Sequence, residues 1–228
     1  MITFNYDLAL DYALRMRHVA VDRGLSAEKG PGIPYLKLHG SLDWARCVKC
    51  KRVVPFDAFR LVENNREGGY CTFPVVSKRL KEIRCPNGAC GGALVEDRPF
   101  IIPPAWSKAR HREGIQPVWM RAAEELADAQ NIFVVGYSMP DTDPFFKYLL
   151  GLGVRVATPV RRLWVWDKED EKEDGRVKAR FKKVLGSGVI EKFGYRQALF
   201  EEAVGKEEVS HEHLGDPPPT LRAALKKC

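Results

Sequence analysis

Four cysteines arranged as two close pairs are the residues of this chain that point most directly to chemistry. Two residues lie between the members of the first pair and four between those of the second, and 34 residues separate the pairs. Cysteine pairs at such spacings are typical of closed tetrahedral zinc sites, which leave no coordination position open for water. We therefore predict a structural Zn²⁺ bound by Cys47, Cys50, Cys85 and Cys90.

The remaining cysteines, Cys71 and Cys228, lack a partner at such a spacing. Cys71 lies between the two pairs and could replace a ligand, but an ordinary thiol is the simpler interpretation. No apolar run approaches the roughly 20 residues that span a bilayer, and the sequence does not open with a basic and then apolar leader. We expect a cytoplasmic protein without a membrane segment, where disulfides are rare.

The elements that must position this cluster fall into two kinds of sequence. Residues 43–98 are rich in cysteine, glycine and charge and lack long periodic runs, which is typical of a module held together by a metal rather than by a core. Residues 1–42 and 99–204 alternate short apolar runs with amphipathic stretches, and residues 205–228 form a polar tail. Such alternation predicts βαβ units, an α/β fold class and a mainly parallel sheet. We expect strands at 1–5, 35–38, 100–102, 131–135, 163–166 and 189–193, and helices at 8–18, 117–129, 145–152 and 177–185.

The net charge of +7 is concentrated around the cysteines. Residues 43–112 contain 14 Lys and Arg against 7 Asp and Glu. Such a region could attract nucleic acid or an anionic cofactor. A solvated, mixed-charge surface is the simpler interpretation, and four thiolates on one Zn²⁺ would contribute about −2 to it.

Several polar residues follow predicted strands. Asn5 and Asp7 follow the first strand, His39 follows the strand at 35–38, and Gly136 and Ser138 follow the strand at 131–135. Open α/β sheets bind their ligands at such strand ends, and a histidine can accept a proton at neutral pH. Each position also has a structural interpretation: a helix cap and its preceding turn for Asn5 and Asp7, a backbone hydrogen bond for His39, and an ordinary turn for Gly136 and Ser138.

These segments, in chain order, resemble a known family. TFNYD at 3–7, LHG at 38–40, the four cysteines and GYS at 136–138 resemble the motifs of the sirtuins, and more closely of a bacterial branch often found in anti-phage defence. The resemblance covers residues 2–193. It implies a Rossmann-type sheet with an inserted four-cysteine zinc module, with NAD⁺ bound in the cleft between them.

The resemblance also implies roles for individual residues. His39 would be the general base on a ribose hydroxyl, and Asn5 would border the nicotinamide. The cofactor-binding residues would be Thr3, Asp7, Gly136, Ser138 and Asp167, the last of which follows the strand at 163–166.

Two departures from the family pattern shape the functional prediction. The family's glycine-rich turn GAGxS, whose amides hold the pyrophosphate, is not found in residues 1–228, so we expect this chain alone to turn over NAD⁺ weakly or not at all. Pro103 and Pro104 lie where deacylases pair with an acyl-lysine peptide, and prolines lack the backbone donors for such pairing.

We therefore predict an NAD⁺ glycohydrolase that releases nicotinamide. The alternatives are an NAD-dependent protein lysine deacylase, an inactive sirtuin-like binding fragment, and a basic zinc-ribbon nucleic-acid binder. NAD⁺ is the expected partner, nucleic acid is not, and a homo-oligomer or a fused or separate effector is a further candidate.

Overall fold

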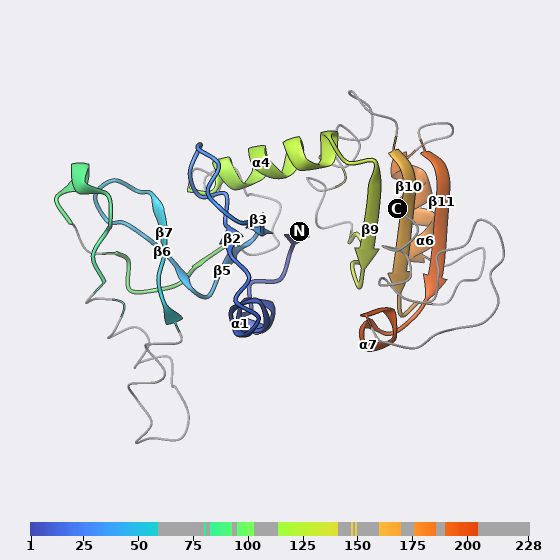
Figure 1. Cartoon of the computed structure of the whole chain (residues 1–228), viewed down its shortest axis with the longest axis horizontal. Helices are drawn as coiled ribbons and strands as arrows, with labels where there is room; N and C mark the ends of the chain where they lie inside the picture. The colour runs from blue at the N-terminus through green and yellow to red at the C-terminus, as the bar shows by residue number, and fades with distance from the viewer. Residues whose placement is uncertain are drawn as a thin grey trace, which may run out of the picture. The chain divides into compact units, whose positions relative to one another are not determined.

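The computed structural model describes residues 1–58, 80, 83–92, 95–102, 114–140, 147, 149, 160–169, 176–185 and 190–204. The chain divides into two compact units, Met1–Ala122 (unit 1) and Ala123–Cys228 (unit 2). Figure 1 shows the elements of each unit. The sequence predicted other boundaries, with a zinc module at 43–98 inside a larger domain and a tail at 205–228. Those boundaries stay a prediction.

Unit 1 begins with two short parallel strand pairs. β1 (Ile2–Thr3) pairs with β4 (Leu36–Lys37), and β2 (Val21–Asp22) pairs with β3 (Ile33–Pro34). Helix α1 (Ala9–Met16) follows β1. The predicted strand at 35–38 and helix at 8–18 are confirmed, with shorter bounds.

The cysteine region contains its own small elements. β6 (Trp44–Arg46) and β7 (Val53–Pro55) form an antiparallel hairpin, and the 3-10 turn η2 spans Gly88–Cys90. The buried residues of this region, cysteines included, pack into one cluster: Ala45, Cys47, Val54, Leu80, Cys85, Cys90 and Val95. Apolar side chains therefore surround the thiols, and the expectation that a metal holds this module together stays a prediction.

The predicted strand at 100–102 forms a different pairing from the one expected. β8 (Phe100–Ile101) pairs antiparallel with β5 (Gly40–Ser41) rather than joining a parallel sheet. The sequence did not predict β5, because a strand of two residues is too short to show an alternating pattern.

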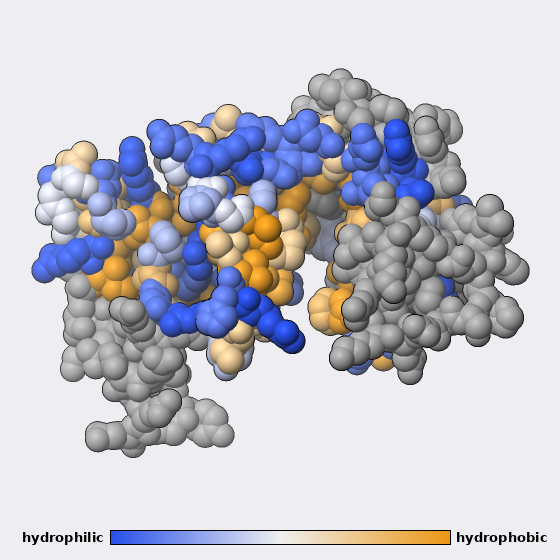
Figure 2. Space-filling model, viewed as in Figure 1, coloured by the Kyte–Doolittle hydropathy of each residue, from blue (hydrophilic) through white to orange (hydrophobic). Residues whose placement is uncertain are grey.

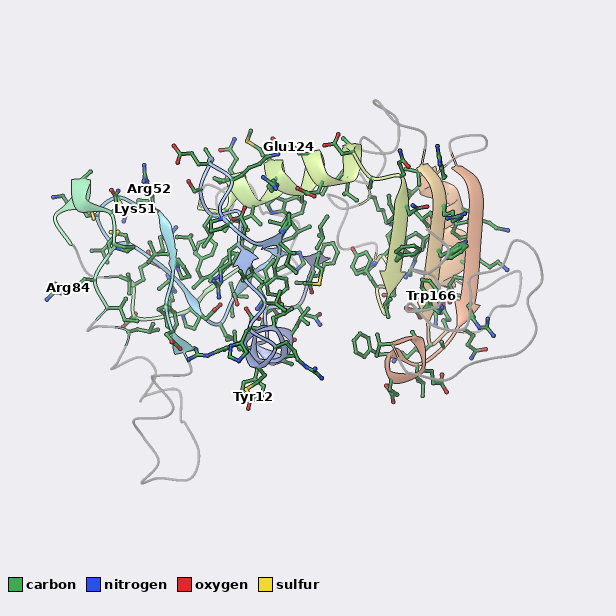
Figure 3. All side chains as sticks on the ribbon, in the orientation of Figure 1. Tyr12, Lys51, Arg52, Arg84, Glu124 and Trp166 are labelled. Carbon is green, nitrogen blue, oxygen red and sulfur yellow. The ribbon has the colours of Figure 1, made fainter. Side chains whose placement is uncertain are left out.

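Helix α4 (Gln116–Ala127) has the amphipathic pattern that the sequence predicted. Val118, Ala122 and Leu126 on its apolar face are buried. The helix ends at Ala127, two residues before the predicted end at Ala129. Figure 2 shows hydrophilic residues along the outer side of α4, where the exposed Glu124 is labelled in Figure 3. None of the helices in the described part of the chain has the length and apolar character needed to cross a membrane.

Unit 2 contains a parallel sheet in the order β11-β10-β9. Its strands are β9 (Asn131–Val135), β10 (Val160–Asp167) and β11 (Ile190–Gln197). Helix α6 (Arg176–Leu185) connects the last two strands, and α7 (Phe200–Val204) follows β11. The predicted α/β alternation and parallel pairing are confirmed here.

Tryptophans from β10 form the apolar cluster on one face of this sheet. Trp164 and Trp166 pack with Phe133 and Ala203, and the rings of Phe133 and Trp164 lie 5.8 Å apart. Both tryptophans therefore pack within the apolar cluster of this sheet. The predicted helix at 145–152, apart from residues 147 and 149, and the tail at 205–228 lie outside the described residues.

Candidate functional site

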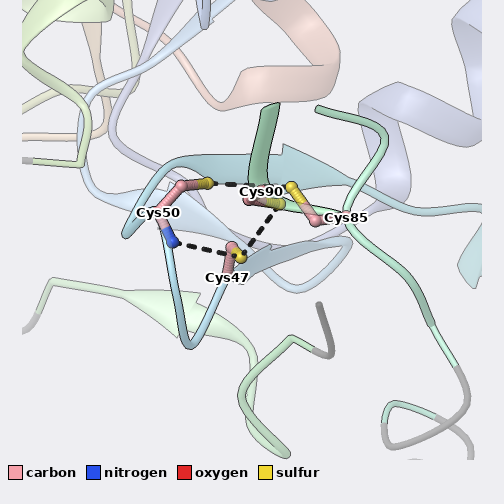
Figure 4. A group of neighbouring side chains, drawn as sticks. All are labelled: Cys47, Cys50, Cys85 and Cys90. Carbon is pink, nitrogen blue, oxygen red and sulfur yellow. Dashed lines mark hydrogen bonds between the residues drawn. The ribbon is translucent and has the colours of Figure 1, made fainter. Parts of the chain in front are cut away.

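The four predicted zinc ligands converge on one point in unit 1. Cys47 follows β6, Cys50 lies in the turn to β7, and Cys90 ends η2 (Figure 4). The Sγ atoms of Cys47 and Cys90 are 3.9 Å apart, those of Cys50 and Cys85 are 3.8 Å apart, and all four lie within 4.8 Å of one another. A tetrahedral site with Zn–S bonds of about 2.3 Å has S–S edges of about 3.8 Å. The donor set therefore fits Zn²⁺.

The surroundings of the thiols favour a bound cation. Hydrogen bonding from the backbone of Arg52 lowers the pKa of Cys50 to about 6, whereas burial raises the pKa of Cys85 to about 12. Four adjacent thiolates repel one another, so they do not all ionise unless a cation compensates them. A bound Zn²⁺ would supply that charge and would link the hairpin to η2. Cys71 and Cys228 lie outside the described residues.

A second group of predicted residues lies at the ends of β1 and β4. These strands are parallel, with Thr3 opposite Lys37, so Asn5 and His39 follow neighbouring strands at the same end. The Thr3 Oγ1 accepts a hydrogen bond from the Asn5 backbone N–H at 3.1 Å. The ring of Phe4 meets the ring of His39 edge-on, with centroids 5.4 Å apart. The structure therefore brings the predicted Thr3, Asn5 and His39 together.

Exposure differs between the two proposed catalytic residues. Asn5 is exposed, whereas His39 is only 7% exposed. Asp7 is exposed and forms the turn that leads into α1, where its Oδ1 accepts the Ala9 N–H at 2.9 Å. Asp7 is therefore part of the turn before α1, whose N-cap is Leu8 without a side-chain hydrogen bond, and the helix-cap interpretation of Asp7 is wrong.

The glycine after His39 is required by close backbone packing. Gly40 has φ +81°, and a Cβ on it would lie 2.1 Å from the Phe100 carbonyl oxygen. The His39 carbonyl accepts the Ile102 N–H at 2.9 Å, on the same β5–β8 pairing. The neighbouring Leu38 carbonyl accepts the Trp119 Nε1–H at 3.1 Å. The backbone on both sides of His39 is thus fixed.

A buried polar network beside these strand ends was missed by sequence reasoning. The Nζ of Lys37, a residue only 1% exposed, donates to Asp7, Asp11 and Ser41. The Tyr35 hydroxyl also donates to Asp11, at 3.0 Å. The one sequence feature that could have indicated this network is the lysine at position 37, inside the otherwise apolar segment 35–38.

A cavity of about 590 Å³ adjoins this network on the α1 side. Asp11, Tyr35 and Asp43 line it, together with Phe56 and other residues, but Asn5 and His39 do not. It is therefore separate from the predicted nucleotide site, and we do not assign the nucleotide to it.

The remaining predicted residues belong to unit 2 and lie at one edge of its sheet. Gly136 follows β9 with φ +66°, and its N–H donates to the Trp166 carbonyl at 2.8 Å. Asp167 ends β10 and is buried, and its Oδ1 accepts the Glu169 N–H at 3.0 Å. The Ser138 carbonyl accepts from the Arg180 Nη1 at 3.2 Å. Carboxyl ends of parallel strands are where such sheets bind ligands.

Comparison with known proteins adds a sequence relative. No family model matches the chain. A 114-residue segment, 49% of this chain, is 32% identical to an NAD-dependent protein deacylase of Daphnia pulex. The chain spans only 38% of the length of that relative.

Solved structures of Sir2 enzymes show a weak likeness. A Sir2 enzyme studied for mechanism and regulation is 19% identical with a TM-score of 0.36, over 80% of this chain and 58% of that one. Sir2Tm bound to a propionylated peptide is 16% identical with a TM-score of 0.36, over 81% and 61%. Because these scores are low, the assignment depends on the sequence match and the ordered motifs. On that basis the chain resembles the sirtuins.

Proposed function

We propose that this protein consumes NAD⁺ and releases nicotinamide, with water as the acceptor of the ADP-ribosyl group. The observation that carries the proposal is the position of Asn5 and His39, which follow adjacent parallel strands of a sirtuin-like chain. Strand ends of this kind place polar side chains where a ligand of an open α/β fold lies.

The proposed chemistry assigns one task to each residue. The bond between nicotinamide and the ribose C1′ breaks, a water oxygen bonds to C1′, and one proton is released. His39 accepts a proton from a ribose hydroxyl as a general base, that hydroxyl regains a proton from the attacking water, and the released proton leaves from His39. Asn5, which is exposed and held by Thr3, contacts the nicotinamide end of the substrate.

The resemblance alone assigns the remaining dinucleotide contacts to residues of unit 2. Gly136 and Ser138 would contact the second ribose and the phosphates, and Asp167 the adenosine ribose. Their common location at the carboxyl ends of β9 and β10 supports this assignment.

Protein lysine deacylation is the second candidate function, and the name of the Daphnia pulex relative favours it. It shares the nicotinamide-releasing step but transfers the ADP-ribosyl group to an acyl oxygen instead of water. The argument against it comes from Pro103 and Pro104, which lie outside the described residues. The preference for hydrolysis therefore depends on their lack of backbone donors alone.

Product analysis separates these candidates. The full natural protein is incubated with NAD⁺, with and without an acetyl-lysine peptide, and products are measured by liquid chromatography and mass spectrometry. We expect nicotinamide and ADP-ribose in equal amounts without peptide. Product formation only with peptide, together with acetylated ADP-ribose, would establish the deacylase instead. Absence of nicotinamide under both conditions would refute NAD⁺ consumption.

The cellular setting is proposed from the resemblance alone. A cytoplasmic role in anti-phage defence, with a homo-oligomer or an effector as partner, predicts that cells expressing the gene resist phage. Equal plaque counts with wild-type protein and with a His39→Ala variant would argue against that role.

A further inference from the structure

Lys37 is a buried cation whose hydrogen-bonding capacity is fully used. Its ammonium donates to the Asp7 carbonyl at 2.7 Å, to Asp11 Oδ2 at 2.5 Å and to Ser41 Oγ at 2.8 Å. These are the three donors that an ammonium has. The ring of Tyr35 lies 5.6 Å from the nitrogen and adds a cation–π contact.

The partners of Lys37 stabilise its charge. Asp11 is buried and forms the ion pair with Lys37, and it also accepts the Tyr35 hydroxyl. Burial, followed by the neighbouring Asp11 carboxylate, raises the pKa of Tyr35 above its ordinary value, so its hydroxyl stays a donor. A buried charge with such partners holds one geometry, because any displaced group would lose a hydrogen bond in a poorly solvated place.

The three bonds of Lys37 reach residues that lie close in the sequence to both proposed catalytic residues. Asn5 lies two residues before Asp7, whose carbonyl Lys37 holds, and His39 lies midway between Lys37 and Ser41. One ammonium thus ties the turn after β1 to helix α1 and to the backbone on either side of His39.

We propose that Lys37 is a positioning residue for the reaction, one that fixes the turn carrying Asn5 relative to His39. The inference rests on the proposed function, because those two residues must act on one substrate. Misplacement of reacting groups by about 1 Å can cost roughly 10²-fold in rate, so loss of the clamp lowers kcat without removing a substrate contact.

The test uses a charge-balanced variant that keeps the protein folded. Lys37→Met alone leaves Asp11 as a buried, unbalanced carboxylate, so it is combined with Asp11→Asn, whose side-chain oxygen still accepts from Tyr35. The exposed Lys29 supplies the matched control, Lys29→Met. Nicotinamide release and the NMR signals of the His39 ring and the Asn5 side-chain amide are measured for the three full-length proteins.

We expect the double variant to melt cooperatively, to keep KM within about threefold, and to lose about 10- to 100-fold in kcat. The His39 and Asn5 signals should shift or broaden, whereas Lys29→Met matches wild type in both measurements. An unchanged kcat with unchanged signals, or an effect confined to KM, would overturn the positioning role. If wild type releases no nicotinamide, the proposed function fails, and the NMR signals alone still decide whether Lys37 holds the two residues.

Discussion

Ionisable side chains removed from water determine much of the chemistry of unit 1. Asp43 is 3% exposed, and its Oδ2 lies 3.6 Å from the Arg23 Nη2. Burial raises the pKa of Asp43 from its ordinary 3.8, an effect that exceeds the opposing contributions of Ser41 and Arg23. The folded protein therefore holds this proton more tightly than the unfolded chain does.

This difference predicts how the stability contributed by Asp43 depends on pH. Because the folded pKa is the higher one, the folded state binds more protons between the two values, and the free energy of unfolding falls as pH rises through that window from about 3.8 upward. Asp43→Asn removes this loss, so its stability relative to wild type should increase from pH 3.5 to 7. Urea unfolding across that range measures it, with the exposed Asp128→Asn as control. If the free energy of unfolding of wild type instead increased relative to that of Asp43→Asn as pH rises, the assignment would be contradicted.

The cysteine cluster supports a second prediction at the residue scale. We expect one tightly bound zinc per chain by elemental analysis. Cys85→Ser should lose the metal and lower solubility or the melting temperature, because metal binding contributes directly to the folding free energy of such modules. The control variant Cys71→Ser, which changes none of the four predicted ligands, should keep its zinc. Well under one zinc in the purified wild type, or full zinc in Cys85→Ser, is inconsistent with the assigned ligands.

At the scale of elements, the β5–β8 pairing determines where the backbone of His39 lies. Gly40 cannot accept a side chain, because its φ is +81° and a Cβ would overlap the Phe100 carbonyl. Gly40→Ala should therefore cost roughly 2–4 kcal/mol of unfolding free energy from backbone strain and overlap. Gly88→Ala is the matched control, since nothing lies within 4 Å of a Cβ there. Equal melting temperatures for the two variants would show that β5 and β8 are not packed as described.

Elements with long periodic patterns could be predicted from the sequence, and very short strands could not. Strand β9 was expected at its observed bounds, and α4 and α6 within a residue or two of theirs, because apolar runs and helical periodicity extend over many residues. The pairs β2–β3 and β5–β8 are two residues long, so only tertiary contacts define them.

The candidate site divides in the same way. Cysteine spacing was sufficient to predict the metal cluster, and short motifs pointed to Asn5 and His39. Lys37 was missed because a lysine in a strand is usually exposed, and only the folded structure shows its three acceptors.

At the scale of the whole molecule, the net charge of +7 raises the question of nucleic-acid binding. Lys51, Arg52 and Arg84 of the cysteine region are exposed and project outward (Figure 3). We expect this charge to remain solvated, with duplex DNA bound no more tightly than the 10⁻⁴ to 10⁻⁶ M typical of non-specific contacts at physiological salt. Fluorescence anisotropy with a labelled duplex measures the affinity. A submicromolar Kd at physiological salt would favour the nucleic-acid-binding alternative.

The account as a whole depends on NAD⁺ chemistry at the ends of β1 and β4. The most direct measurement is the rate of nicotinamide release from NAD⁺ by the full natural protein and by its His39→Ala variant, with zinc content and melting temperature recorded for both. His39 lies outside the metal cluster, so the variant should keep its zinc and its fold. We predict a rate lower by roughly 10² to 10⁴-fold, the usual contribution of a general base. Equal rates in two folded, zinc-loaded proteins would contradict the proposed site.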